Sequence, residues 1–404
     1  MRRSAAPLRE REFRLLFAGR TISLAGSAIA PVALAFAVLD LTGSKTDLGL
    51  ILAAQQVPLV LFLLVGGIWA DRLPRNKVMV SANVVSAFAQ ACAAGLLIAG
   101  HAQVWHLAAL AAVNGTAIAF YFPASAGVTP QTVPPLLLQE ANALLALARN
   151  ATAIGGAALA GFLVAGFGPG VAIALDAVTF LAAAGIVALM RLELVPREEA
   201  HSFFSDLATG WHEFRSRTWL WVIVLQFSLL LAVDIGAFSV LGPVVADEEL
   251  GGAKAWGAIL TGQAVGLLAG GLVGLRYRPR RMLLVATLAM LLTPASLVAL
   301  GFPLALPLIV VAAAVSGAGI EIFVLLWNTT MQQEIPADKL SRVYSYDALG
   351  SFALLPIGLA AAGPIAELVG VRATLWGAAA IAVAVTLAVL LSHDVRTLER
   401  RPTA

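Results

Sequence analysis

Polar and catalytic residues are scarce in this sequence, and each shortage excludes a class of protein. Only 12% of the 404 residues are Asp, Glu, Lys or Arg, whereas 60% are hydrophobic. A soluble domain of this composition would expose a large apolar surface to water. The formal net charge of +3 comes from basic residues in short loops, without the basic surface and accessible aromatic residues of a nucleic-acid-binding protein. We therefore expect a lipid bilayer around the chain and no nucleic-acid partner.

Clusters that carry chemistry are also missing. Cys92 is the only cysteine, which rules out an intrachain disulfide and a thiolate metal cluster. No His, Cys or carboxylate group has metal-ligand spacing, no glycine-rich phosphate loop carries a lysine, and no nucleophile has a base beside it. We expect no enzyme, no metal site and no cofactor, and the energy for any transport would come from an ion gradient or from the substrate's own gradient instead of ATP.

Long apolar runs make up most of the chain. A membrane-spanning helix needs about 20 mostly apolar residues, and breaks of charge, Pro or Gly divide the chain into runs of that length. Twelve spans are predicted, at about 15–40, 47–70, 77–100, 104–128, 139–165, 170–190, 218–246, 254–275, 281–300, 304–330, 341–368 and 371–391. The predicted fold class is an all-α membrane protein with twelve transmembrane helices in two six-helix bundles, residues 1–191 and 218–404.

The positive charges are distributed as in a protein with both termini in the cytoplasm. With that orientation, only four of the 26 Lys and Arg residues lie outside the cytoplasmic loops and span ends, namely Lys45, Arg149, Lys254 and Arg372. Basic residues concentrate on the cytoplasmic side of membrane proteins, and an odd number of spans would destroy the pattern. We therefore expect a multi-pass protein of the bacterial inner membrane, and we expect it to be a monomer.

The two halves of the chain resemble each other. A shift of 202 residues aligns Gln131, Pro134, Gly156, Gly161 and Gly168 with Gln333, Pro336, Gly358, Gly363 and Gly370. The aligned residues occur in the same context of loop, helix start or helix interior, which chance matches between glycines would not preserve. Parallel repeats of this kind are typical of transporters.

A polar connector, residues 192–217, separates the two predicted bundles. Its apolar residues Phe203, Leu207, Trp211 and Phe214 are spaced so that they fall on one helical face. We interpret the connector as an amphipathic helix on the inner leaflet, with a helix that binds a partner as the alternative.

The most specific motif follows the second predicted span, where the sequence reads Gly67-x-x-x-Asp71-Arg72-x-x-Arg75. Gly67 allows a neighbouring helix to approach closely. Asp71 is a carboxylate at the membrane edge that can meet the positive N-terminus of a helix or an arginine. Arg72 and Arg75 can bridge that carboxylate or bind anionic headgroups.

This motif is similar to the loop motif of the major facilitator superfamily. The resemblance extends over the whole chain and is strongest to the bacterial efflux branch that contains the enterobactin exporter and the macrolide efflux proteins. The chain shares with this branch the short sequence Gln333-Glu334-Ile335-Pro336. Pro74 stands where the family has a glycine, and Asn76 where it has a basic residue. The resemblance implies transport by alternating access, with a cytoplasmic gating latch at Gly67, Asp71, Arg72 and Arg75.

Several charged residues lie inside the predicted spans, where a charge costs at least a few kcal/mol and is a functional candidate by default. They are Asp234 in span seven, Glu321 in span ten, Asp176 in span six, and Arg149 beside Asn150 in span five. A buried carboxylate can exchange protons near neutral pH, so these residues are candidates for coupling or substrate binding. A structural pair, such as Arg149 with Glu321, is the alternative.

Other side chains in the spans can line a cavity or pack helices. Phe323 and Trp327 can stack on a ligand, and a lining of amides and aromatic rings suits a large lipophilic compound better than a sugar. The amides are Gln55, Gln56, Gln90, Asn114, Gln226, Gln263 and Asn328. A glycine at every fourth position of span eight, from Gly262 to Gly274, predicts close helix packing or a sliding surface.

Together these features predict a secondary active transporter, most simply a proton-coupled exporter of a drug-like or natural-product molecule. Import of a small metabolite by symport or facilitation is an alternative within transport. A non-transporting scaffold or receptor of the same fold is the alternative from another class. Such a scaffold has no use for several ionisable residues inside its spans, which argues against it.

Overall fold

The computed structural model describes residues 6–192, 211–277, 279–302 and 304–399, without the side chains of residues 64–72, 275–276, 337–338 and 341–342. Within these ranges all regular structure is helical, and twelve segments are long and apolar enough to cross a membrane. Each predicted span overlaps one of these segments, so the predicted all-helical, twelve-span fold is confirmed. Helices are expected because lipid offers no partner for a free backbone N–H or C=O group.

The chain divides into two compact units, and the boundaries of the two predicted bundles stay predictions. The first unit comprises Met1–Pro196 with Ala246–Thr261, and the second comprises Arg197–Val245 with Gly262–Ala404. Six spans lie in the first 192 residues. They are α1 (Arg11–Ser27) with α2 (Ala30–Thr42), α3 (Lys45–Arg72), α4 (Arg75–Ile98), α5 (Val104–Thr132), α6 (Leu138–Phe167) and α7 (Pro169–Ala188).

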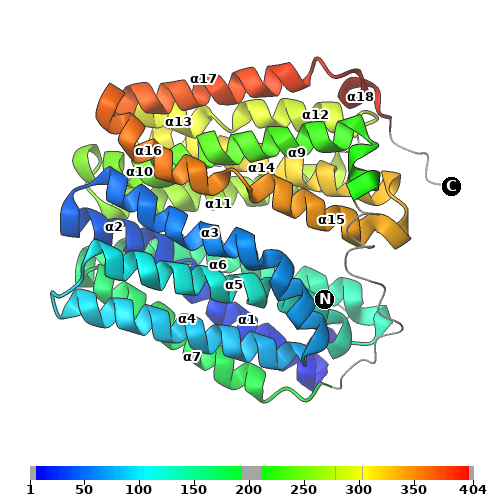
Figure 1. The fold of residues 1–404 in the computed structure, drawn as a ribbon, viewed down its shortest axis with the longest axis horizontal. Helices are drawn as coiled ribbons and strands as arrows, with labels where there is room; N and C mark the ends of the chain where they lie inside the picture. The colour runs from blue at the N-terminus through cyan, green and yellow to red at the C-terminus, as the bar shows by residue number, and fades with distance from the viewer. Residues whose placement is uncertain (1–5, 193–210, 278, 303, 400–404) are drawn as a thin grey trace. The chain divides into compact units, whose positions relative to one another are not determined.

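In the first unit, α3 packs along α5, while α4 and α7 run side by side (Figure 1). The approach of α3 to α5 is close because Gly115 has no side chain, and a Cβ atom there would collide with the backbone carbonyl of Gln55. Small residues at such contacts replace the hydrophobic effect, which cannot drive helices together in lipid. This packing holds α1, α3, α4, α5 and α7 around a common interior.

The later spans are interrupted more often. Span seven consists of α9 (Thr218–Leu230), a π-helical turn at Leu231–Ile235 and α10 (Gly236–Glu249). Span eleven is broken between α15 (Ala337–Phe352) and α16 (Leu355–Val369), which follow one another in orange in Figure 1. The remaining elements are α11 (Ala253–Arg276), α12 (Met282–Ala289), α13 (Ala295–Gly301), α14 (Leu306–Glu334), α17 (Val371–Val389) and α18 (His393–Thr397).

Residues aligned by the 202-residue shift occupy equivalent positions in the two units. Gly168 and Gly370 each precede a span, with φ angles of 83° and 91° that L side chains rarely adopt. Gly156 packs on Ala28 in span one, and Gly358 packs on Ala232 in span seven. Each unit therefore brings its fifth helix onto its first helix at a glycine.

The glycine stripe of α11 is a packing surface. A Cβ atom at Gly262, Gly266 or Gly270 would meet the backbone carbonyl of Val310, Ala314 or Ala318 on α14. Among the described residues, a Cβ atom at Gly271, which is adjacent but off the stripe, would have only the Glu321 side chain within 4 Å, at 3.7 Å. The stripe thus lets two helix backbones touch, which agrees with the packing interpretation of the sequence.

Gly266→Ala is expected to destabilise the protein by about 1–3 kcal/mol, because the new methyl group would force α11 away from α14. Thermal unfolding of the purified protein in detergent measures the loss. Gly271→Ala is the matched control and should keep or slightly raise the midpoint, because alanine fits there and has the higher helix propensity. Equal midpoints for the two variants would contradict the close contact.

The connector is described from residue 211 onward, so Phe203 and Leu207 lie outside the described residues. Residues 211–215 are helical, and Trp211 and Phe214 both contact the ring of Tyr346 on α15. Glu213 is buried beside them and accepts a hydrogen bond of 2.8 Å from Lys339 Nζ as well as one from Arg217. These two cations lower the pKa of Glu213 from its ordinary value of 4.5.

Glu213→Gln is expected to lower the thermal midpoint at neutral pH by the equivalent of about 1 kcal/mol, since both ion pairs are partly screened by solvent. A carboxylate with a lowered pKa stabilises the fold above its unfolded pKa and loses that contribution as the pH falls through its folded pKa. The midpoints of the variant and the parent should therefore converge below pH 4.5. A difference that is independent of pH would show that the ion pairs do not stabilise the fold.

Candidate functional site

The gating motif is only partly visible. Helix α3 continues to Arg72, but the side chains of Asp71 and Arg72 and the surroundings of Gly67 are outside what the structure describes, so the latch stays a prediction. Arg75, at the start of α4, donates a hydrogen bond to the backbone carbonyl of Gly127 on α5. That bond ties the end of the motif to the fourth span of the same unit.

Asn76, which departs from the family motif, has a structural role. Its side chain is buried, and its Nδ2 atom donates a hydrogen bond of 3.0 Å to the carbonyl of Met190. A basic side chain at this position could not be buried without a partner. The substitution thus fixes the start of α4 to the end of α7.

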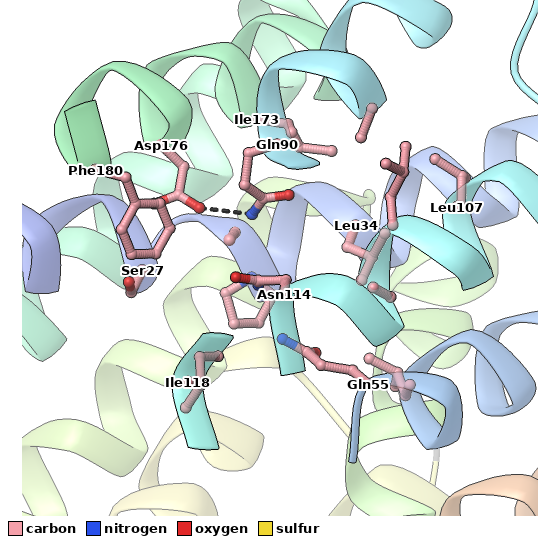
Figure 2. A pocket seen from close by; sticks show the side chains of 16 residues that line it. Ser27, Leu34, Gln55, Gln90, Leu107, Asn114, Ile118, Ile173, Asp176 and Phe180 are labelled. Carbon is pink, nitrogen blue, oxygen red and sulfur yellow. Dashed lines mark hydrogen bonds between the residues drawn. The ribbon is translucent and has the colours of Figure 1, made fainter. Parts of the chain in front are cut away.

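Asp176 lies in a polar cavity inside the first unit. Figure 2 shows Asp176 from α7, Gln90 from α4, Asn114 from α5 and Gln55 from α3 around the cavity, which has a volume of about 120 Å³. The carboxylate is fully buried, and its Oδ2 atom accepts a hydrogen bond of 2.6 Å from Gln90 Nε2. We call this the Asp176 cavity.

Asp234 is the second predicted carboxylate that the structure places in the interior. It is 5% exposed and sits in the π-helical turn of span seven, a rare conformation that is frequent at functional sites. Thr293, at the break between α12 and α13, lies near the carboxylate, while its hydroxyl donates a hydrogen bond of 3.1 Å to the carbonyl of Met290. The Oδ1 atom of Asp234 has no hydrogen-bond partner among the described residues.

The other predicted residues are less enclosed, and the structure does not gather the candidates into one site. Glu321 is half-buried on α14 beside Gly271 of α11. Arg149 is exposed and Asn150 is half-buried on α6. The proposed pairing of Arg149 with Glu321 joins residues of different units and stays a prediction.

Sequence reasoning missed Asp347, although it falls within the predicted span 341–368. It lines a cavity of about 230 Å³ in the second unit, between α9, α14 and α15. Its carboxylate accepts hydrogen bonds of 3.3 Å from Trp327 Nε1 and from Ser351 Oγ. The rule that marks charged residues inside spans as candidates would have found it.

Parallel aromatic rings form one wall of this cavity, which we call the Asp347 cavity. Phe323 lies between Phe227 and Trp327, with ring centroids 5.2 Å and 6.3 Å away and interplanar angles of 6° and 8°. Asn328, which accepts a hydrogen bond of 3.2 Å from the Tyr344 hydroxyl, lies on the polar side. Phe323 and Trp327 both line this cavity, as their predicted stacking on a ligand would require.

Comparison with known families decides the class of the protein. The family model described as Major Facilitator Superfamily matches residues 16–358. The chain belongs to the major facilitator superfamily.

Curated relatives within the superfamily match almost the full chain at low identity. Macrolide efflux protein A of Streptococcus pyogenes is 24% identical over 395 residues, covering 96% of this chain and 97% of that protein. The multidrug efflux pump Tap of Mycolicibacterium fortuitum is 26% identical over 378 residues, covering 89% and 90%. The superfamily and these relatives are transporters.

Solved structures share the fold. The nucleoside transporter NupG has a TM-score of 0.74 at 13% identity, with 94% of this chain and 98% of that one covered. A POT family transporter in complex with 5-aminolevulinic acid has a TM-score of 0.75 at 11% identity, with 95% and 96% covered. A superfamily member with these twelve apolar helices is a multi-pass membrane transporter, and its substrate is a small molecule.

Proposed function

We propose that this superfamily member exports lipophilic compounds that carry a positive charge, and that a proton gradient drives the export. The observation that carries the proposal is the Asp347 cavity, which combines stacked aromatic rings with a carboxylate. Relatives at 24% and 26% identity are a macrolide efflux protein and a multidrug efflux pump, which supports the direction of transport.

The chemistry of the Asp347 cavity favours a cationic, ring-containing group. Both hydrogen-bond donors to the carboxylate are neutral, so its charge is not cancelled by a described basic side chain. Aromatic faces attract cations, and the flat rings offer an apolar surface for a lipophilic body. A cavity of about 230 Å³ holds one such group of a larger compound.

Asp234 is our candidate for the proton carrier. An ionised carboxylate that is buried without a countercharge is costly, and binding a proton removes that cost. The unpartnered Oδ1 atom of Asp234 is available for this proton. Asp234 lies within the π-helical turn Leu231–Ile235, and such turns are frequent at functional sites.

The remaining parts of the proposal rest on the expectations drawn from the amino-acid sequence. The protein lies in the bacterial inner membrane with both termini in the cytoplasm and acts as a monomer by alternating access. Asp71 and its neighbours in the gating motif form the cytoplasmic latch. Protons and the exported compound are the only ligands that this cycle requires.

Asp347→Asn is expected to raise the KM for a lipophilic cation about tenfold, equivalent to about 1.4 kcal/mol of lost attraction, while export of a neutral compound of similar size is unchanged. Export is measured as loss of a fluorescent cation, and of a neutral dye, from cells that lack other pumps. Ser351→Ala, which keeps the carboxylate and removes one donor, is the matched control.

An equal loss for the cation and the neutral compound would contradict the role of charge at Asp347. Membrane abundance of each variant, measured on the same cells, separates a binding defect from poor folding. Transport of sugars or amino acids inward, without export of either dye, would favour the importer instead.

Asp234→Asn is expected to abolish proton-driven uptake into inverted membrane vesicles but to spare exchange of labelled for unlabelled substrate, because exchange needs no net proton movement. Glu321→Gln, which neutralises the half-buried carboxylate of α14, should retain driven uptake. An uncoupler should reduce driven uptake by the parent protein to the level measured for Asp234→Asn.

Two results would oppose this assignment. Driven uptake that survives Asp234→Asn would exclude Asp234 as the proton carrier. Accumulation by the parent protein that is insensitive to the uncoupler would exclude proton coupling altogether. Absence of any transport by a folded parent protein across the tested compounds would favour the scaffold alternative.

A further inference from the structure

The Asp176 cavity is not used by the proposed export cycle, yet it is an enclosed polar site in the interior of the first unit. Five polar side chains line it, contributed by five helices: Ser27, Gln55, Gln90, Asn114 and Asp176. The other lining residues are apolar. At about 120 Å³ the cavity is too small for a drug-sized compound, but it has room for an ion with a few water molecules.

No described basic side chain balances the charge of Asp176. Among the described residues of α1, α3, α4, α5 and α7, no Lys, Arg or His lines the cavity, and no second acidic residue does. Gln90 Nε2 donates to the carboxylate at 2.6 Å, and the Thr179 hydroxyl lies 3.5 Å from the other oxygen. Donors that point at a carboxylate favour its ionised form. These donors lower the cost of ionising Asp176, and a cation bound in the cavity would balance the negative charge.

A second group in the cavity also lacks a partner. Asn114 is only 7% exposed, and its Oδ1 atom has no hydrogen-bond donor in the described chain. Figure 2 shows this amide facing the cavity that Asp176 and Gln90 border. Because a buried acceptor without a donor is unfavourable, a ligand that attracts oxygen atoms would satisfy Asn114 and Asp176 together.

The donor set identifies the class of ligand. Carboxylate, amide and hydroxyl oxygens are hard ligands that suit alkali and alkaline-earth cations rather than transition metals. A single carboxylate balances one positive charge, whereas a divalent ion would leave an excess charge in the membrane interior. We propose that the Asp176 cavity binds one sodium ion, held by Asp176 and Asn114.

Sodium binding is tested by thermal unfolding of the purified full-length protein in detergent, with NaCl replaced stepwise by choline chloride at constant ionic strength and pH. Sodium should raise the midpoint by several degrees in a saturable manner, because a ligand that binds only the folded state stabilises it. The shift should vanish in Asp176→Asn and weaken at least tenfold in apparent affinity in Asn114→Leu. Asp234→Asn is the matched control and should keep the full shift.

Each other result overturns the proposal. A parent protein that choline and sodium stabilise equally has no sodium site. A sodium shift that persists in both Asp176→Asn and Asn114→Leu places the ion elsewhere. If lower pH stabilises the parent protein but not Asp176→Asn, while sodium has no effect, the cavity takes a proton. Should Asp176→Asn fail to fold, Asn114→Leu and the parent titration still decide the outcome, and neither depends on whether export is proton-coupled.

Discussion

The absence of water around the spans is the constraint on which the rest of this structure depends. It requires helices, since every backbone polar group must find its partner within the chain. It removes the hydrophobic drive between helices, so contacts form where glycine lets backbones touch, as at Gly115, Gly266 and Gly358. It also makes each unpaired charge in the interior expensive. The three carboxylates Asp176, Asp234 and Asp347 are therefore the candidates for functional sites.

Most of the fold could be predicted from the sequence because helices surrounded by lipid require long apolar runs, which are visible in the sequence. The spans, the close packing of the Gly262–Gly274 stripe and the equivalent positions of Gly156 and Gly358 all follow from local composition or from the internal repeat. The breaks inside the spans were harder to predict. The π-helical turn at Leu231–Ile235 has no proline or glycine within it to signal it, whereas the interruption before Leu355 coincides with Pro356 in the first turn of α16.

The candidate sites were predicted less completely, and the reason is geometric. Asp176 and Gln90 are 86 positions apart in the sequence, and only the packing of α4 against α7 brings them within hydrogen-bonding distance. Asp347 could have been found by the same rule as Asp234, but its significance depends on the rings of Phe323 and Trp327 beside it. The roles of Glu321 and Arg149 depend on how the two bundles meet, so they remain predictions.

Helix α15 joins two features that have been described separately. Lys339 near its first turn is bonded to Glu213 of the connector, and Asp347 lines the aromatic cavity further along the same helix. The helix has 16 residues and ends at the break before Leu355, so it is a rod of roughly 24 Å with a joint at one end. The residue that binds the connector and the residue that lines the Asp347 cavity thus belong to one continuous helix, so the position of that cavity wall is tied to the connector.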